Sequence, residues 1–106
     1  MKKIAILGST GSIGRNAIKT AESLGWEVLA IAAKDNSDGF LGQVRAHRPK
    51  YAAVFDHDAW AGLKGILPRG TRLLAPGVEG LTEMAALADA DVVLNSISGS
   101  VGFAPL

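Results

Sequence analysis

Three glycines spaced three residues apart form the clearest chemical signal in the sequence. Gly8, Gly11 and Gly14 follow the apolar run from Ile4 to Leu7, which has the length of a β-strand. After the third glycine, apolar residues recur at helical spacing. Glycines at a strand-to-helix turn let backbone N–H groups approach a phosphate, because no Cβ stands in the way. The pattern therefore predicts that a phosphate-bearing ligand, typically a dinucleotide, binds at this turn.

Each residue of the turn has a predicted role. Gly8 would make the tight turn, Gly11 would admit the pyrophosphate, and Gly14 would let the helix pack closely on the strand. The first N–H groups of the helix have no internal partners and carry the positive end of the helix dipole, so they favour an anion. The hydroxyls of Thr10 and Ser12 can donate to phosphate oxygens. The alternative is a glycine-rich turn that binds no ligand.

Strand and helix patterns alternate along the chain. Strands are predicted at residues 4–7, 26–32, 51–55, 71–75 and 91–97, and helices at 12–24, 40–47, after Asp56, and around 81–88. This alternation indicates an α/β fold, a doubly wound Rossmann-like parallel sheet with helices on both faces. We expect the first strand at the centre of the sheet, and the chain to switch sides after the third strand. In the first helix, Ile13, Ala17, Ala21 and Leu24 should share one apolar face, with Ile18 beside them.

Ligands of such folds bind outside the C-terminal ends of the strands. The glycine turn after the first strand lies there, and so does a second glycine loop at residues 98–102. The end of the second strand normally contacts the adenosine ribose, and here it continues into Lys34, Asp35 and Asn36. Lys34, and Arg15 in the first helix, favour a 2′-phosphate and hence NADP, whereas Asp35 suits the ribose of NAD. Lys34 could equally be a solvated surface charge, and for Arg15 the solvated surface charge is the favoured interpretation.

Composition limits the classes of protein that the chain can represent. The 106 residues fit one domain, with 48% hydrophobic residues and a net charge of +1. This charge gives no general attraction to nucleic acid. No apolar stretch is long enough to span a bilayer, and the N-terminus leads directly into the first predicted strand, so we expect neither a membrane anchor nor a signal peptide. The chain contains no cysteine, which excludes disulfides, thiolate metal sites and a cysteine nucleophile. We expect a cytoplasmic protein with no nucleic-acid or membrane partner.

Residues with catalytic or metal-binding spacing are missing from the sequence. The carboxylates are scattered, and His47 and His57 have no second ligand nearby, so both are interpreted as structural. Tyr51 is followed four residues later by Phe55, so the Y-x-x-x-K pair of short-chain dehydrogenases is absent. We therefore expect neither a catalytic residue nor a metal ligand in this chain.

A family resemblance follows from three stretches. Residues 8–14, GSTGSIG, resemble the glycine motif of the 1-deoxy-D-xylulose 5-phosphate reductoisomerases, NADPH-dependent enzymes of the non-mevalonate isoprenoid pathway. Residues 48–54 resemble the family's approach to its third strand. Residues 91–105 resemble the strand and loop beside the nicotinamide, and the matching positions are Ile97, Gly99, Gly102 and Pro105. The resemblance covers essentially the whole chain, but only the N-terminal region of the family.

The resemblance implies a set of cofactor-binding residues. The predicted residues are Gly8, Thr10, Gly11, Ser12, Ile13, Gly14, Lys34, Asp35, Asn36 and Gly99. Two departures from the family pattern stand out. Asp35 occupies a position where many relatives have a basic or small residue beside the 2′-phosphate. Ser96 and Ser98 lie where relatives are often apolar.

The resemblance also implies what the whole enzyme would do. Such an enzyme isomerises and reduces 1-deoxy-D-xylulose 5-phosphate to 2-C-methyl-D-erythritol 4-phosphate, using NADPH and Mg²⁺ or Mn²⁺, and would be a homodimer. The family's metal carboxylates, lid and substrate-phosphate groups would lie beyond Leu106. We therefore expect residues 1–106 to be the NADPH-binding domain, a fragment without turnover of its own. The alternatives are the NAD(P)-binding domain of a semialdehyde-type dehydrogenase and a non-enzymatic nucleotide-sensing module.

Overall fold

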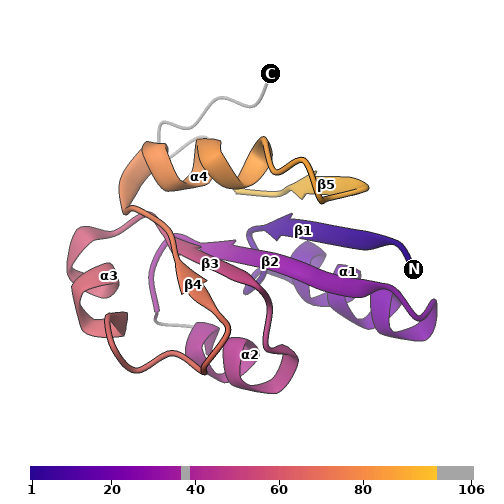
Figure 1. Cartoon of the computed structure of the whole chain (residues 1–106), viewed down its shortest axis with the longest axis horizontal. Helices are drawn as coiled ribbons and strands as arrows, with labels where there is room; N and C mark the ends of the chain where they lie inside the picture. Colours follow the sequence, from indigo (N-terminus) through magenta and orange to yellow (C-terminus); the bar gives the residue numbers. More distant parts are fainter. Residues whose placement is uncertain (37–38, 98–106) are drawn as a thin grey trace.

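A computed structural model of the chain describes residues 1–36 and 39–97, and shows alternating strands and helices (Figure 1). The elements are β1 (Lys3–Leu7), α1 (Ser12–Ser23), β2 (Glu27–Ala33), α2 (Phe40–His47), β3 (Tyr51–Val54), α3 (His57–Leu63), β4 (Arg72–Leu73), α4 (Gly77–Ala85) and β5 (Val92–Asn95). The strands form one sheet in the order β4-β3-β2-β1-β5, and all four pairings are parallel. The predicted α/β class and parallel sheet are confirmed.

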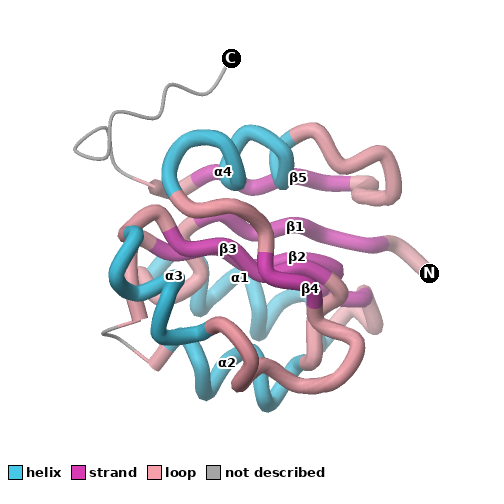
Figure 2. The backbone as a smooth tube through the Cα atoms, turned by 60° about the vertical axis from the view of Figure 1, so that its left-hand side comes forward, coloured by secondary structure: helices cyan, strands magenta, loops and turns pink. Residues whose placement is uncertain are grey.

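Helices cover both faces of the sheet, as predicted. Figure 2 shows α1, α2 and α3 on one side and α4 on the other. The two hydrophobic cores match this arrangement. Ile18 of α1, Phe40 of α2 and Leu63 of α3 belong to one core, whereas Leu81 and Met84 of α4 belong to the other.

The sequence of β2 reflects burial on both of its faces. Residues 28–33 are all buried. Ile31 and Ala33 pack in the core beneath α1, α2 and α3, and Ala30 and Ala32 pack in the core beneath α4. An uninterrupted apolar run is what a parallel strand with helices on both faces requires.

Two details of the predicted topology are wrong. β1 is an interior strand but lies off centre, next to last in the sheet, and the chain switches sides after β4 rather than after β3. The cause is the face that α3 covers. Because parallel crossovers are right-handed, helices on one face carry the chain in one direction across the sheet. α3 packs on the same face as α1 and α2, so β4 continues outward beside β3. α4 crosses the opposite face and returns the chain to β5 beside β1.

The buried face of α1 also differs from the prediction. Ala17 is partly buried and Ala21 is buried, but Ile13 is 62% exposed and Leu24 is exposed as well. The buried residues are Gly14, Ile18 and Ala21, which follow helical spacing from the last glycine of the turn. The helix is therefore rotated so that a glycine, rather than Ile13, faces the sheet.

Local signals fix the ends of several helices. Gly25 follows α1 with a φ of +73°, and the Asp56 side chain caps α3 by accepting a hydrogen bond from the Ala59 N–H at 2.9 Å. Within residues 1–36 and 39–97, no helix has the length and apolarity needed to cross a bilayer.

Candidate dinucleotide-binding site

The predicted site residues lie in turns that follow neighbouring parallel strands. The glycine turn follows β1, the corner at residues 34–36 follows β2, and Ser96 follows β5. Because β2, β1 and β5 are adjacent and parallel, the three segments lie at the same edge of the sheet (Figure 1). This is the edge where doubly wound folds bind their ligands. Gly99 and Ser98, which were also singled out in the sequence, lie outside the described residues.

Gly8 makes the tight turn that the sequence predicts. Its φ of +98° lies in the left-handed region that favours glycine. The N–H groups of Gly8 and Ser9 both donate to the carbonyl of Ala32, at 2.7 and 2.9 Å, which fixes the turn to β2. A Cβ on Gly8 would meet the Ser96 Oγ and would lie 3.0 Å from the Ser96 carbonyl carbon. Both the backbone angle and the available space therefore require glycine here.

Ser96 holds the end of β5 against the turn. Its N–H donates to the Leu7 carbonyl at 2.8 Å, and its Oγ lies 3.1 Å from the Leu7 carbonyl oxygen and 3.3 Å from that of Gly8. The hydroxyl that departs from the apolar family pattern therefore has a structural role, which is to join β5 to the turn after β1.

Gly14 allows the close packing that was predicted for it. A Cβ at this position would overlap the carbonyl oxygen of Gly8 and would lie 2.7 Å from the Cα of Ser9. These neighbours are backbone atoms, which cannot rotate away as a side chain can. The first turn of α1 therefore rests directly on the start of the loop.

Gly11 differs from the other two glycines because nothing within the described protein requires a glycine there. Its φ of −78° and ψ of 171° are accessible to any residue, and the nearest atom to a Cβ placed on it is the Gly8 carbonyl oxygen at 3.8 Å. That distance is ordinary van der Waals contact. The open space beside Gly11 is consistent with the predicted approach of a pyrophosphate.

The N-terminus of α1 presents backbone donors at the same place. Gly11 is the N-cap, no side chain of the described residues caps the helix, and the first turn carries no acidic residue. The first helical hydrogen bond runs from the Arg15 N–H to the Gly11 carbonyl at 2.9 Å. The N–H groups of residues 12–14 precede that bond, so they are the donors that a helix leaves for an anion. The Thr10 carbonyl accepts a hydrogen bond from the Arg15 Nε at 2.8 Å, which brings the guanidinium to the loop.

The corner after β2 is held in place from β3. The N–H of Phe55 donates to the Ala33 carbonyl at 3.0 Å, and the N–H of Asp56 donates to the Lys34 carbonyl at 2.8 Å. Lys34, Asp35 and Asn36 are exposed. The structure thus brings the corner to the ligand edge of the sheet with its side chains accessible to solvent.

Asn36 also acts as a helix cap. Its Oδ1 accepts a hydrogen bond from the N–H of Leu41, in the first turn of α2, at 3.0 Å. The cap uses the oxygen of this side chain, so its NH₂ group is the end that can donate to a ligand.

One polar pair at the loop was missed in the sequence. Ser9 is completely buried, and its Oγ donates to the Oε1 of Gln43 at 2.7 Å. The Gln43 Nε2 in turn donates to the Ser9 carbonyl at 2.8 Å. The partners lie 34 residues apart and on different elements, so no local pattern could have paired them.

The two histidines make contacts with neighbouring side chains. His47, at the end of α2, pairs with Glu22 of α1, with 3.2 Å between Nδ1 and Oε2. His57 begins α3, and its ring lies 5.4 Å from that of Trp60. Among residues 1–36 and 39–97, no group of three or more His, Cys, Asp or Glu side chains is arranged to hold a metal ion.

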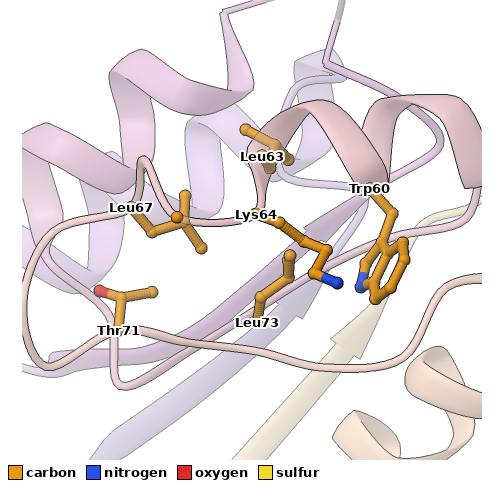
Figure 3. Close-up of a pocket in the computed structure, with 7 residues that line it drawn as sticks. Trp60, Leu63, Lys64, Leu67, Thr71 and Leu73 are labelled. Carbon is orange, nitrogen blue, oxygen red and sulfur yellow. The ribbon is translucent and has the colours of Figure 1, made fainter.

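A cavity of about 320 Å³ lies between α3 and β4, apart from the glycine turn. Its lining residues are Trp60, Leu63, Lys64, Gly65, Leu67, Thr71 and Leu73 (Figure 3). The Lys64 ammonium lies 4.8 Å from the centre of the Trp60 ring. The lining is mainly apolar and includes no residue predicted to bind the nucleotide.

Comparison with known proteins identifies relatives along nearly the whole chain. The chain is 39% identical over 108 residues to the 1-deoxy-D-xylulose 5-phosphate reductoisomerase of Elusimicrobium minutum, and 42% identical over 107 residues to that of Protochlamydia amoebophila. These alignments cover 100% and 99% of this chain, respectively, but 27% of each relative. The chain therefore spans about a quarter of the length of the curated relatives it matches.

Solved structures give the same result for the fold. The reductoisomerase from Zymomonas mobilis in complex with NADPH superimposes with a TM-score of 0.80 and 25% identity, over 95% of this chain and 27% of that one. A reductoisomerase in complex with NADPH, fosmidomycin and magnesium superimposes with a TM-score of 0.82 and 28% identity, over 96% of this chain and 26% of that one. The sequence profile of the 1-deoxy-D-xylulose 5-phosphate reductoisomerase family matches residues 4–106, and the chain belongs to this family.

Proposed function

We propose that residues 1–106 form the NADPH-binding domain of an enzyme that isomerises and reduces 1-deoxy-D-xylulose 5-phosphate to 2-C-methyl-D-erythritol 4-phosphate, in isoprenoid biosynthesis. Family membership supports this activity over the semialdehyde-dehydrogenase and sensor alternatives. Two solved relatives are complexes with NADPH. The observation in this chain that carries the proposal is Gly11, a glycine that neither its backbone angles nor its neighbours require, at the N-cap of a helix that no described side chain caps.

The glycine turn would hold the pyrophosphate of the cofactor. Gly11 admits it, the N–H groups of residues 12–14 donate to it, and Thr10 and Ser12 supply hydroxyls. Ile13 is 62% exposed beside this turn, where burial against a bound cofactor would remove its apolar surface from water. Gly8 and Gly14 act indirectly, because they fix the shape of the loop.

The corner after β2 would hold the adenosine end. Lys34 pairs with the 2′-phosphate, Asp35 turns away from it, and Asn36 donates from its amide. Gly99 contributes at the nicotinamide end. The bound cofactor supplies a hydride, and the residues of this chain bind and orient it.

The remaining parts of the reaction would belong to the rest of the enzyme. The described residues do not fit a divalent cation, because no cluster of ligands occurs among them. Relatives have been solved with magnesium, and we assign Mg²⁺ or Mn²⁺ to the full-length enzyme with ligands outside this chain. The sugar-phosphate substrate would be held there too. We further propose a homodimeric full-length enzyme with no nucleic-acid or membrane partner, on the strength of the family resemblance alone.

The cofactor preference can be measured by calorimetric titration of the chain with NADPH and NADH at fixed low salt. We expect NADPH to bind more tightly, because a charge-assisted hydrogen bond to the 2′-phosphate contributes about 1.5–3 kcal/mol, or about tenfold to a hundredfold in affinity. Lys34→Ala should weaken NADPH binding selectively. The matched control is Lys64→Ala, which removes the same charge beside the cavity in Figure 3 and should change neither affinity.

Two outcomes would contradict this assignment. Equal affinities, or tighter binding of NADH, would mean that Asp35 faces the ribose hydroxyls. An equal loss for both nucleotides in Lys34→Ala would place Lys34 at the shared pyrophosphate.

A further inference from the structure

The turn between β1 and α1 is anchored from three sides. β2 holds it through the Ala32 carbonyl, which accepts from two consecutive N–H groups, and β5 holds it through Ser96. The third anchor is a side chain, Gln43 of α2, which makes two hydrogen bonds to Ser9. The Ala32 anchor uses backbone groups alone, and the Ser96 anchor combines a backbone hydrogen bond with contacts of its hydroxyl. The Gln43 anchor is made entirely by a side chain.

The Gln43–Ser9 pair is matched atom for atom. The Ser9 carbonyl can only accept, so the amide must present its NH₂ group to it, at 2.8 Å. The Gln43 Oε1 is then directed at the Ser9 hydroxyl, which donates to it at 2.7 Å. A carboxylate could accept from the hydroxyl but could not donate to the carbonyl, and an apolar side chain could do neither. Glutamine can satisfy both groups at once.

Burial makes this pair sensitive to substitution. Ser9 is 0% exposed, and in the part of the chain that the structure describes no buried side-chain nitrogen or oxygen lacks a partner. Removing the amide would leave a buried hydroxyl and a buried carbonyl without their partner, and the backbone at Ser9 would shift to reach water or another group. Gly11, the N-cap of α1, lies only two residues further along the chain.

Resting on the function proposed above, we propose that Gln43 is a positioning residue for the cofactor: it fixes the backbone of Ser9 and thereby the direction of the N–H groups that receive the pyrophosphate. It touches no part of the nucleotide. Because the pyrophosphate is common to NADPH and NADH, the loss of Gln43 weakens the binding of both nucleotides by the same factor. This distinguishes Gln43 from Lys34, whose loss weakens the binding of NADPH alone.

The test compares calorimetric titrations of NADPH and NADH in the wild-type chain, in Gln43→Met and in Ser9→Ala. Methionine keeps the approximate length of glutamine and its unbranched Cβ–Cγ stem, but it lacks the terminal amide that makes both hydrogen bonds. We expect about tenfold weaker binding of both nucleotides in Gln43→Met, with an unchanged ratio between them; tenfold corresponds to about 1.4 kcal/mol. Ser9→Ala keeps the hydrogen bond from the Gln43 amide to the residue 9 carbonyl and should give a smaller loss of affinity. The double variant should lose less binding free energy than the sum of the losses in the two single variants, because both single changes remove the same hydrogen bond between Ser9 and Gln43.

Thr71→Val is the matched control. The Thr71 hydroxyl donates to the Pro49 carbonyl at 2.6 Å, which is also a partly buried hydrogen bond but lies beside β4, away from the turn. The substitution should lower the temperature of unfolding and leave both affinities unchanged. It therefore separates a loss of stability from a loss of positioning.

Each remaining outcome has a defined meaning. Unchanged affinity in folded Gln43→Met overturns the inference, and so does a loss confined to NADPH. If Gln43→Met does not fold, Ser9→Ala decides alone, and unchanged affinity for both nucleotides in that variant overturns the inference. If the wild-type chain binds neither nucleotide, the proposed function fails and the positioning role fails with it. If the wild-type chain binds both nucleotides and the variants bind them with the same affinities, the proposed function stands and only the positioning role of Gln43 is wrong.

Discussion

Replacing Gly11 with alanine is expected to abolish most NADPH binding while the chain stays folded. The backbone angles of Gly11 suit alanine, and its Cβ would meet the Gly8 carbonyl oxygen at an ordinary 3.8 Å. Alanine is a poorer N-cap than glycine, so the free energy of unfolding should fall by about 1 kcal/mol or less. The methyl group would, however, stand where the pyrophosphate has to approach the backbone. We expect at least about hundredfold weaker binding, or about 2.8 kcal/mol.

The Gly11→Ala variant should be compared with the wild-type chain by urea denaturation and by NADPH titration on the same preparation. Near-wild-type stability with lost affinity is the expected pair of results. Unchanged affinity would show that the ligand does not approach Gly11. A large loss of stability would show that the fold requires a glycine at this position. That result would favour the alternative of a glycine-rich turn that binds no ligand.

Gly14→Ala should have the opposite effect, a large loss of stability. Alanine normally favours a helix over glycine, by about 1 kcal/mol. At this position its Cβ would overlap the Gly8 carbonyl oxygen and lie 2.7 Å from the Ser9 Cα, so α1 or the loop must move. Overpacking against atoms that cannot rotate away costs about 3 kcal/mol.

Gly42→Ala is the control for this prediction. Gly42 also lies within a helix, α2, but a Cβ there would have no neighbour within 4 Å, so alanine should raise the free energy of unfolding by about 0.5–1 kcal/mol. Urea denaturation of both variants measures the difference. If Gly14→Ala proved as stable as Gly42→Ala, the close packing of α1 on the loop would be wrong.

Local patterns predicted most of the secondary structure because they act over a few residues. The bounds of α2, Phe40–His47, were predicted without error. The helix predicted after Asp56 was also correct. The switch of sides after β4 was not predictable in this way. It depends on the face of the sheet that α3 covers, and a short helix with Leu63 as its buried residue can pack on either face.

The rotation of α1 shows a second limit of the sequence pattern. Hydrophobicity alone directs Ile13 and Leu24 toward the core, but contact between the backbones at Gly14 and Gly8 sets the orientation of the helix. The smallest residue of the helix therefore faces inward, and Ile13 is left exposed beside the proposed pyrophosphate site.

The candidate site was predictable where it is contiguous in sequence and not where it is assembled by the fold. The roles of Gly8 and Gly14 in the turn follow from a seven-residue motif. The contacts of Ser9 with Gln43 and of Ser96 with the turn join residues 34 and 88 or more positions apart. Only the order of the strands and the placement of α2 bring these residues together.

Binding of NADPH at the glycine turn can be observed residue by residue in an NMR titration that follows each backbone N–H resonance. We expect saturable shifts concentrated at residues 8–14 and 34–36, with the N–H groups of residues 12–14 among the largest. Residues lining the cavity in Figure 3 should not shift. Saturable binding whose shifts centre on that cavity, or the absence of shifts in the turn at NADPH concentrations that saturate the calorimetric signal, would show that NADPH does not bind at the glycine turn.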